Sequence, residues 1–469
     1  AARLPRGARV ALYAEPGPDA ALLFWACARL GLVVVPVDSA WDEAAFVKAL
    51  DLVEPALVFA DARRAAAARA SGRTTVIVDG PTRTVAEPPA LDFADWLVAG
   101  GQAGPLANPA DETDTAVVLF TSGTTGDPKG VELSHGALVR AARLLAGVGA
   151  LGAEDRLLTL SEFHTVSGLR NPLVMAVAAG AAAVLPTAAE RHHPASLAAL
   201  CAREGVTVLS AVPAALKGLA GAADRIGPEA LRSLRLVMST GADLPAATVD
   251  RLGALTEVPV MTYYGLTETG GVCALGAAGL GDGAIGHPAD AVLQIVDPDG
   301  KPLPPGEAGE LRVYGANRMI RHHRRPDLDA RALRDGWIYT GDIATRRADG
   351  TILLIGRDRD RLKTARGDRL HLSEIERLLE RDPAVIEAAA CIARDAGDDG
   401  DDRALAFVRL VDGAEPNAVV ERLKHRALAC LGHRAAPPDI RVRTDFPRAA
   451  NGKVRRHALL EEQGPDGQG

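Results

Sequence analysis

Short apolar segments alternate with Ala- and Leu-rich helical segments along the first half of the chain, and this alternation constrains the fold most strongly. Residues 8–13 (ARVALY) and 32–37 (LVVVPV) have the pattern of strands, and the helical segment DAALLFWACARLG lies between them. A strand, a helix and a strand in succession favour a parallel sheet covered by helices. Further apolar segments continue the pattern at 56–61, 74–78, 115–120, 207–212, 235–240 and 259–265. We therefore predict an α/β fold whose large N-terminal domain contains layered α/β sheets.

The chain changes in character after these segments. A Gly- and Pro-rich stretch covers 276–309, and the short apolar segments LQIVD (293–297) and ELRVYG (310–315) have β-type spacing. This pattern predicts a small β subdomain at the end of the large domain. Near residue 355, the segment TILLIG is followed by a dense charged stretch, RDRDRLKTARGDR. We place a domain boundary there.

The residues after this boundary, 356–460, predict a small mobile α+β C-terminal domain. Ser373 begins SEIE, which fits a capping box with Glu376 at its fourth position, and the helix that follows carries one apolar stripe. Two strand-like segments, AAACIAR and ALAFVRLV, come next. The polar tail 461–469 predicts disorder. The expected domains are therefore 1–355 and 356–460, followed by this tail.

The composition excludes several classes of protein. The 469 residues carry 53 basic and 60 acidic side chains, a net charge of −7, so no basic surface for a nucleic acid is expected. The longest apolar run, 172–186, is short and bounded by Pro, which predicts a buried helix followed by a strand and no membrane span. Five widely spaced Cys residues without a CxxC pair argue against a zinc site and a disulfide framework. They predict reduced thiols in a cytoplasmic protein.

The segment 115–134, TAVVLFTSGTTGDPKGVELS, carries the strongest chemical signal. An apolar strand leads into a loop with hydroxyl side chains, glycines and Lys129. Glycines let backbone N–H groups approach an anion, hydroxyls donate hydrogen bonds and the ammonium group neutralises charge, so the composition predicts a phosphate-binding loop. The pattern differs from the GxxxxGK[ST] of ordinary P-loops. A flexible linker is the alternative, but Ser134 begins a capped helical pattern directly after the loop.

The segment TSGTTGDPKG resembles the phosphate-loop signature of the adenylate-forming superfamily, which includes acyl- and aryl-CoA synthetases, nonribosomal peptide synthetase adenylation domains and luciferases. Further segments resemble other boxes of the family, in the family's order: STGADLP at 239–245, YYGLTETGG at 263–271, WIYTGD at 337–342, GRDRD at 356–360 and FPRAANGKVRRHAL at 446–459. Ordered matches over most of the chain are specific, and the sequence is identified as a member of this superfamily.

The resemblance implies a reaction in two steps. A carboxylate attacks the α-phosphate of ATP to give an acyl-adenylate and pyrophosphate. A thiol of CoA or of a carrier protein then attacks the acyl carbon and releases AMP. Both steps depend on stabilised charge more than on covalent participation of the protein. The implied cofactors are ATP and Mg²⁺, with CoA or phosphopantetheine as the acceptor.

Roles of single residues follow from the same resemblance. The β- and γ-phosphates of ATP would be held by Thr121, Ser122, Gly123, Thr124, Thr125, Gly126 and Lys129. The base and the ribose would be bound by Gly241, Ala242, Asp243, Tyr264, Asp342 and Arg357. Within this second set, Tyr264 is expected to stack on adenine and Asp342 to accept hydrogen bonds from both ribose hydroxyls.

The resemblance also implies the catalytic groups and a hinge. Thr267 and Glu268 belong to the YGxTE box, and Glu268 is expected to bind Mg²⁺, a hard cation that prefers carboxylate and phosphate oxygens. Lys453 matches the family's catalytic lysine and would bridge the attacking carboxylate and the α-phosphate. Without the motifs, both residues would be interpreted as ordinary surface residues. The hinge position, commonly Asp or Lys in relatives, corresponds to Arg359, with Asp360 beside it as the other candidate.

The segment EFHTVSGL at 162–169 indicates the class of acid. Amino-acid adenylation domains place an Asp after this Phe to pair with the substrate ammonium group, whereas this chain has His164. An unpaired buried ammonium group is costly, so a non-amino acyl or aryl acid is predicted. By alignment, the neutral walls of the acyl pocket are His164, Thr165, Gly168, Met238, Thr240, Tyr263, Gly271 and Val272. His164 joins Lys453, Thr267 and Glu268 as a candidate catalytic residue, and a histidine that only shapes the pocket is the alternative.

The acceptor stays open between two thiols. Simple CoA ligases usually have SGGE after the hinge, whereas this chain has KTARGDRLH, which is closer to the KxRG of carrier-protein-loading domains. CoA is the first choice and a carrier protein the alternative, since both offer a phosphopantetheine thiol. Two weaker alternatives are a non-thiol acceptor and a degenerate nucleotide-binding module without turnover. The degenerate module is disfavoured because the main residue of each box is intact, namely Lys129, Glu268, Asp342 and Lys453.

Two histidine pairs, His192–His193 and His322–His323, are predicted to be solvated loop residues and not metal ligands. Adjacent residues on a strand point to opposite faces, and no Cys or carboxylate cluster accompanies them at ligand spacing. The second pair falls where relatives have Gly-Tyr before xxxPE, replaced here by Arg321-His322. The sequence offers no physical reason for this replacement.

Overall fold

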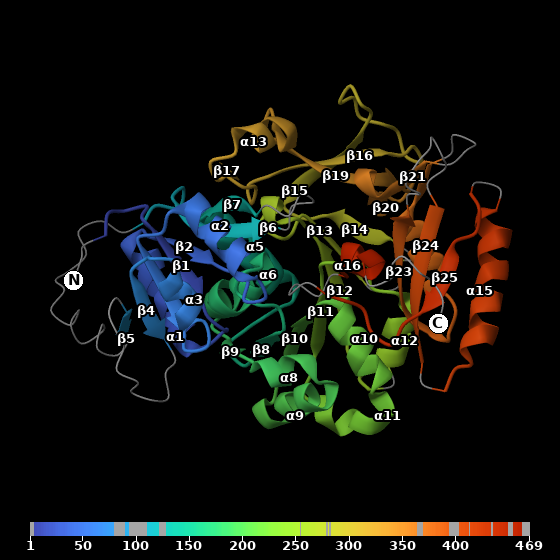
Figure 1. Cartoon of the computed structure of the whole chain (residues 1–469), viewed down its shortest axis with the longest axis horizontal. Coiled ribbons are helices and arrows are strands. Elements are labelled where there is room, and N and C mark those ends of the chain that lie inside the picture. The colour runs from blue at the N-terminus through green and yellow to red at the C-terminus, as the bar shows by residue number, and fades with distance from the viewer. Residues whose placement is uncertain are drawn as a thin grey trace.

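A computed structural model contains two large sheets surrounded by helices and a smaller α+β part at the C-terminal end (Figure 1). The layered α/β class predicted from the sequence is confirmed. The structure describes residues 4–78, 90–92, 110–121, 128–253, 255–277, 280, 283–363, 369–393, 403–411, 413–432, 435–448 and 454–461. Among these residues, no helix is long and apolar enough to span a membrane.

The first large sheet is built mostly from the N-terminal segments. Its strands are β1 (Arg9–Tyr13), β2 (Val33–Pro36), β3 (Leu57–Asp61), β4 (Thr75–Val78), β5 (Ala90–Asp92), β6 (Thr115–Thr121), β7 (Lys129–Ser134) and β17 (Arg321–His322). Their order is β17-β7-β6-β2-β1-β3-β4-β5. The strands from β6 to β5 in this order pair in parallel, and β7 and β17 are antiparallel at one edge. The helices α1 (Pro18–Leu30), α2 (Glu43–Val53) and α3 (Ala65–Ala70) connect successive parallel strands, as the strand–helix–strand pattern predicts.

The second large sheet changes from parallel to antiparallel along its width. Its parallel strands are β8 (Arg156–Thr159), β9 (Ala182–Val184), β10 (Val208–Ala211), β11 (Leu236–Ser239) and β12 (Val260–Tyr264). The antiparallel strands are β13 (Ala274–Ala277), β14 (Ala284–Pro288), β15 (Ala291–Val296), β16 (Gly309–Gly315), β18 (Leu333–Arg334), β19 (Trp337–Arg346) and β20 (Ile352–Arg357). The main order is β15-β16-β19-β20-β14-β13-β12-β11-β10-β8-β9. The predicted β subdomain is therefore continuous with the α/β layer through β12 and β13.

Helices of the large part cover these sheets. Ser134 accepts a hydrogen bond from the amide of Ala137 and caps α5 (His135–Val148), as predicted. The run 172–186 forms a π-helix (Arg170–Met175), α7 (Ala176–Ala179) and β9, which confirms a helix followed by a strand. The other helices are α6 (Val166–Leu169), α8 (Ala188–His192), α9 (Pro194–Glu204), α10 (Pro213–Gly221), α11 (Ala223–Ile226), α12 (Ala246–Leu252), α13 (Pro326–Ala332) and the 3₁₀ helices Pro228–Leu231, Thr267–Thr269 and Asp358–Asp360.

The C-terminal part has its own sheet and apolar core. Its elements are β21 (Arg361–Lys363), β22 (Arg369–His371), α14 (Leu372–Glu380), β23 (Val385–Ala393), β24 (Arg403–Leu410), α15 (Pro416–Leu431), β25 (Asp439–Val442) and α16 (Arg456–Glu461). Buried apolar side chains between Leu362 and Ile440 pack together here and form a cluster separate from the cores of the large sheets. Of the predicted tail, Glu461 ends α16 and 462–469 lie outside the described residues.

The capping box predicted at Ser373 is wrong by two residues. The helix α14 is preceded by His371, whose backbone N–H donates to Glu374 Oε1 at 3.0 Å. Ser373 lies inside the first turn, and its hydroxyl donates to the carbonyl of Ile355 at 2.6 Å. The sequence pattern fits the later register, because His371 is not a usual N-cap residue, and the contact to β20 favours the earlier start.

Direct contacts join the C-terminal part to the large part, where Figure 1 shows α10 and α12 beside the C-terminal strands. Lys217 of α10 forms an ion pair with Glu380 of α14 at 2.7 Å, and both side chains are largely buried. Arg251 of α12 donates to the carbonyl of Pro383 at 2.5 Å. Arg377 donates to the carbonyl of Ile355 at 3.0 Å.

Candidate active site

A cluster of three predicted nucleotide-binding residues forms where the parallel and antiparallel parts of the second sheet meet. The hydroxyl of Tyr264, the last residue of β12, donates to Asp342 Oδ2 at 2.5 Å. Arg357 Nε lies 3.0 Å from Asp342 Oδ1. The structure therefore brings together residues that are 78 and 15 positions apart, as the resemblance predicts.

The strands fix the orientation of Asp342. It pairs with Arg357 in the antiparallel register of β19 and β20, and its backbone N–H donates to Thr340 Oγ1 at 3.1 Å. Burial, and then the neighbouring Asp342 carboxylate, raise the pKa of Tyr264 well above its ordinary value. The phenol therefore stays protonated and acts as a donor.

The predicted base-binding turn follows β11. Gly241 adopts a φ of +94°, in the left-handed region that favours glycine. Gly241, Ala242 and Asp243 are all exposed, and Asp243 Oδ2 accepts the backbone N–H of Gly283 at 3.1 Å. The hydroxyl of Thr240 donates to the carbonyl of Tyr263 at 2.7 Å and ties this turn to β12.

Glu268, the predicted Mg²⁺ ligand, lies in the 3₁₀ helix after β12 together with Thr267. Its Oε1 is 3.8 Å from His322 Nε2, and its carbonyl accepts the N–H of Met319 at 2.7 Å. Burial raises the pKa of Glu268, but His322, a backbone hydrogen bond and Arg357 together outweigh it, so the pKa ends below the ordinary value. An ionised carboxylate with partial access fits a hard divalent cation that takes its remaining ligands from phosphate oxygens and water.

The prediction that His322 and His323 are solvated is wrong. His322 Nδ1 lies 2.7 Å from Asp329 Oδ1, and His323 Nδ1 lies 2.7 Å from Glu132 Oε1; both imidazoles are buried. Burial lowers the pKa of His322, but its two carboxylate neighbours outweigh this and raise the pKa overall. The partners lie far away in the sequence, so the pair looks isolated there. His192 and His193 are exposed, as predicted.

The structure describes the two ends of the predicted phosphate loop. Thr121 and Lys129 are register partners in the antiparallel pair β6–β7, so the strands bring the start and the end of the loop together. A Cβ on Gly130 would lie 2.7 Å from Val118 Cγ1, so glycine is required for this close approach. The other predicted members of the loop, Ser122, Gly123, Thr124, Thr125 and Gly126, lie outside the described residues, as does Lys453.

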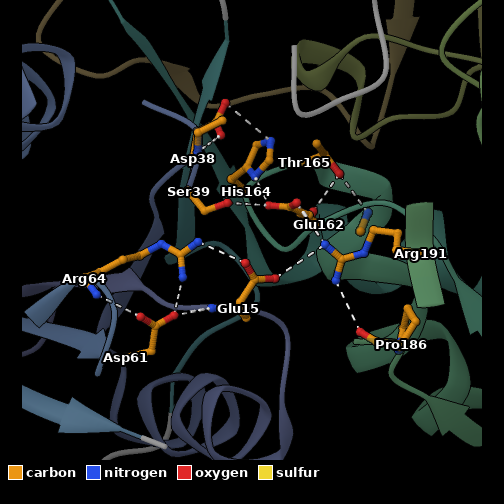
Figure 2. A network of polar contacts seen from close by, with 12 residues as sticks. Glu15, Asp38, Ser39, Asp61, Arg64, Glu162, His164, Thr165, Pro186 and Arg191 are labelled. Atoms are coloured by element: carbon orange, nitrogen blue, oxygen red, sulfur yellow. Dashed lines mark hydrogen bonds and ion pairs between the residues drawn. The ribbon is translucent and has the colours of Figure 1, made fainter. Parts of the chain in front are cut away.

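The predicted pocket residue His164 lies in a polar network between the two large sheets (Figure 2). His164 follows β8, and its Nδ1 is 3.5 Å from Glu162 Oε2 while its Nε2 is 3.8 Å from Asp38 Oδ2, from the loop after β2. Glu162 Oε2 also accepts the hydroxyl of Ser39 at 3.0 Å, and its Oε1 accepts Arg191 Nη1 at 2.9 Å. The imidazole is thus held between two carboxylates.

Further charge pairs, partly buried, extend this network into the first sheet. Arg191 Nη1 lies 3.6 Å from Glu15 Oε2, and Arg64 bridges Glu15 and Asp61. Figure 2 shows these side chains converging from both sheets. Burial raises the pKa of Glu162, but His164 and Arg191 outweigh it and hold the pKa at about 2. Glu162 is therefore ionised at neutral pH and fixes the position of His164.

The turn after His164 depends on close backbone packing. The hydroxyl of Thr165 donates to the carbonyl of Glu162 at 2.8 Å and accepts the N–H of Gly168 at 3.0 Å. A Cβ on Gly168 would lie 1.9 Å from the carbonyl oxygen of Glu162, so only glycine fits.

The remaining predicted pocket walls are buried, and they adjoin a charged residue that sequence reasoning missed. Met238, Tyr263 and Val272 are at most 3% exposed. Arg170, at 0% exposed, donates to the carbonyl of Gly270 at 2.7 Å and lies beside Tyr263. In the sequence, the signal that could have identified Arg170 is an arginine beside the longest apolar run.

The predicted hinge forms the 3₁₀ helix after β20. Arg359 is half exposed, whereas Asp360 Oδ2 accepts Arg456 Nη1 at 3.1 Å. Arg456 also contacts Glu376 at 2.7 Å, so Asp360 is tied to the core of the C-terminal part. Which of the two hinge candidates acts as the pivot stays a prediction.

Comparison with known proteins shows the family to which this chain belongs. A family model described as AMP-binding enzyme matches residues 2–321. The chain belongs to the AMP-binding enzymes. The matched range includes the segments 115–134, 239–245 and 263–271, which carry three of the boxes named above.

Relatives of this AMP-binding enzyme match over nearly its whole length. The sulfoacetate–CoA ligase of Cupriavidus necator is 30% identical over 464 residues, covering 98% of this chain and 88% of that protein. The fatty acid–[acyl-carrier-protein] ligase ScoC of Streptomyces coeruleorubidus is 30% identical over 488 residues, covering 98% and 88%. The crystal structure of the anthranilate CoA ligase AuaEII in complex with anthranoyl-AMP superposes with a TM-score of 0.87 at 23% identity, covering 98% and 88%, and shows the shared fold.

Proposed function

We propose that this AMP-binding enzyme is an ATP-dependent ligase that activates a non-amino carboxylic acid as acyl-AMP and transfers the acyl group to a phosphopantetheine thiol. The observation that carries the proposal is the Tyr264–Asp342–Arg357 cluster, with Glu268 following the same strand. Asp342 offers a carboxylate for the ribose hydroxyls. Thr121 and Lys129 bracket the loop for the phosphates.

The chain's own residues then have distinct tasks. Glu268 would hold Mg²⁺, which neutralises phosphate charge when bound. Arg357 orients Asp342 and adds positive charge beside the ribose and phosphate positions. Lys453 bridges the reacting carboxylate and the α-phosphate. His164, fixed by Glu162, bounds the acyl pocket.

The acceptor of first choice is CoA, and a carrier protein is the alternative. The name of the Cupriavidus necator relative supports CoA, whereas that of the Streptomyces coeruleorubidus relative supports a carrier protein. The KTARGDRLH segment also favours the carrier protein. We place the enzyme in the cytoplasm because its five cysteines are free thiols, four of them buried.

We further propose that residues 1–355 and 356–460 are separate domains and that the second moves between the two half-reactions. Its separate apolar core supports this division. The predicted hinge residues Arg359 and Asp360 lie in the 3₁₀ helix after β20, at the start of the second unit.

The deciding experiment measures acid-dependent ATP–pyrophosphate exchange over a panel of carboxylic acids, followed by thioester formation with CoA or a phosphopantetheinylated carrier protein. Exchange with one class of acid names the substrate, and the thiol that accepts the acyl group names the acceptor. Absence of exchange with every acid, despite ATP binding, would favour the degenerate nucleotide-binding module.

Lys453→Ala tests the catalytic assignment. Losing an electrostatic contact of this kind lowers the adenylation rate by on the order of 10²–10³-fold, whereas thioester formation from supplied acyl-AMP stays near the wild-type rate. Lys424→Ala is the matched control, since Lys424 is an exposed lysine on α15. Equal losses in both half-reactions contradict the assignment of Lys453.

A further inference from the structure

Arg170 is a completely buried arginine at the start of the π-helix. Its Nε and Nη2 donate to Asn171 Oδ1 at 3.0 and 2.9 Å, and its Nη1 donates to the carbonyl of Gly270 at 2.7 Å. Nη2 also reaches the hydroxyl of Tyr263 at 3.5 Å, a long contact. Every one of these acceptors is neutral.

The guanidinium group has no anionic partner among the residues that the structure describes. A guanidinium carries five N–H donors, and these contacts use one of the two N–H groups on Nη1. Arg191, which is similarly buried, contacts the carboxylates of both Glu162 and Glu15. The lack of an anionic partner therefore distinguishes Arg170 from Arg191.

Burying a charge without a counter-charge is expensive. Burial lowers the pKa of Arg170, although arginine keeps its proton in proteins. Neutral acceptors replace part of the lost hydration, but a charge-assisted pair is stronger. The guanidinium group of Arg170 would therefore bind an anion more strongly than it binds these neutral acceptors.

The charge also adjoins the predicted acyl pocket. A Cβ on Gly271 would lie 2.9 Å from Arg170 Nη1 and 2.6 Å from Val166 Cγ1, so the backbone of Gly271, a predicted wall of the pocket, packs directly against the guanidinium group. The ring centroid of Tyr263, another predicted wall, lies 5.6 Å from the guanidinium carbon. Tyr263 lies in β12, and Gly271 follows the 3₁₀ helix that carries Glu268.

We propose that Arg170 binds a second anionic group, a carboxylate or a sulfonate, at the far end of the acid substrate. This inference rests on the proposed ligase function and narrows its substrate class to acids with two anionic groups. The reacting carboxylate does not satisfy Arg170, because it loses its charge when it becomes acyl-AMP. A second anionic group keeps its charge through both half-reactions.

The test compares matched acids in ATP–pyrophosphate exchange with the full chain. Succinate, glutarate, terephthalate and sulfopropanoate carry two anionic groups, and butanoate, pentanoate and toluate are the monoanionic counterparts. For wild type, we expect the best dianionic acid to exceed its counterpart in kcat/KM by about tenfold or more. Arg170→Met should lower this kcat/KM by on the order of 100-fold and change the monoanionic value by less than about fivefold.

Two further variants separate binding of an anion from a structural role. Arg170→Lys keeps the charge and should retain more of the preference for dianionic acids than Arg170→Met or Arg170→Gln. Arg235→Met is the matched control, because Arg235 forms an ion pair with Asp155 at 2.6 Å outside the predicted pocket. Its ratio of dianionic to monoanionic kcat/KM should equal the wild-type ratio.

The outcomes distinguish this inference from the proposed function. Wild-type exchange with monoanionic acids alone, or equal losses for both sets in Arg170→Met, overturns the role of Arg170 and leaves the ligase standing. Absence of exchange with every acid overturns the ligase and the inference together. If Arg170→Met does not fold, the wild-type preference and Arg170→Lys decide the matter.

Discussion

Asp342 has contacts on both carboxylate oxygens before any ligand is considered. Tyr264 donates to Oδ2 and Arg357 lies on Oδ1, yet a carboxylate offers about four acceptor positions. Lone pairs therefore remain for two ribose hydroxyls. The two protein contacts fix the orientation of the carboxylate, so binding of the ligand costs little conformational entropy at this side chain.

Tyr264→Phe should raise the KM for ATP by about tenfold with little change in kcat. The substitution keeps the ring for adenine and removes the donor to Asp342, a hydrogen bond to a charged group worth about 1.5–3 kcal/mol. Steady-state kinetics at saturating acid measure the effect. Tyr314→Phe, on an exposed tyrosine of β16, is the control and should match wild type. A large fall in kcat would argue that the hydroxyl takes part in the chemistry.

Glu162 makes the free energy of unfolding dependent on pH in the acid range. Its pKa is about 2 in the folded protein against an ordinary 4.5, so the stabilisation is present above pH 4.5 and is lost as the pH falls toward 2. The shift corresponds to on the order of 3 kcal/mol. Glu162→Gln should be less stable than wild type at pH 7 and lose less stability on acidification.

Urea unfolding at pH 7, 4.5 and 3 measures this effect. Glu229→Gln removes an exposed carboxylate and should follow the wild-type curve. Identical acid dependence of Glu162→Gln and wild type would contradict the network around His164.

The sequence predicts the contacts of single residues well where the residues belong to a motif. It predicts them poorly where their partners lie far away in the sequence. Tyr264, Asp342 and Arg357 meet as their boxes imply. His323 is buried against Glu132, 191 positions away, and such a pairing has no local signature. Arg170 was missed because the apolar residues around it dominate the pattern, and only the fold shows that they enclose a charge.

At the scale of elements, the parallel strands were predictable because each is a short apolar run between turn signals. The run at 235–240, for example, forms β11 at Leu236–Ser239. The ribose box WIYTGD was recognised by motif, yet it lies in the ten-residue strand β19, whose alternating burial is hidden by its polar residues. The start of α14 was misplaced because its N-cap, His371, lacks the usual capping signature, whereas Ser373 two residues later has it.

Gly168→Ala should destabilise the protein by at least about 2 kcal/mol, because its Cβ would collide with the backbone of Glu162 and push α6 away from β8. Thermal unfolding and acid-dependent exchange measure the loss. Gly147→Ala is the control, since nothing lies within 4 Å of its Cβ near the end of α5. That control should be stabilising by about 0.5–1 kcal/mol. A Gly168→Ala variant as stable as wild type would mean that this turn relaxes freely.

At the scale of the whole molecule, the Lys217–Glu380 pair favours one arrangement of the C-terminal part. Removing one partner leaves a buried charge, a cost of about 3–5 kcal/mol to this arrangement. Lys217→Met and Glu380→Gln should therefore each change the ratio of adenylation to thioester-formation rates by tenfold or more, in the same direction. The measurement is the two half-reactions assayed separately.

The double variant Lys217→Met/Glu380→Met is the control for this prediction. It removes both charges and should return the ratio toward wild type, since well-packed apolar replacements of buried pairs are often neutral. Opposite shifts in the two single variants would show that the pair does not select between arrangements.

Arg357 ends β20 and directly precedes the 3₁₀ helix with the hinge candidates, while its guanidinium holds the carboxylate of Asp342. In the function that we propose, occupancy of the nucleotide site and the position of residues 356–460 therefore share one side chain and form a single thermodynamic cycle. In such a cycle the coupling free energy is reciprocal. The free energy by which bound nucleotide favours one position of the domain therefore equals the free energy by which that position strengthens nucleotide binding.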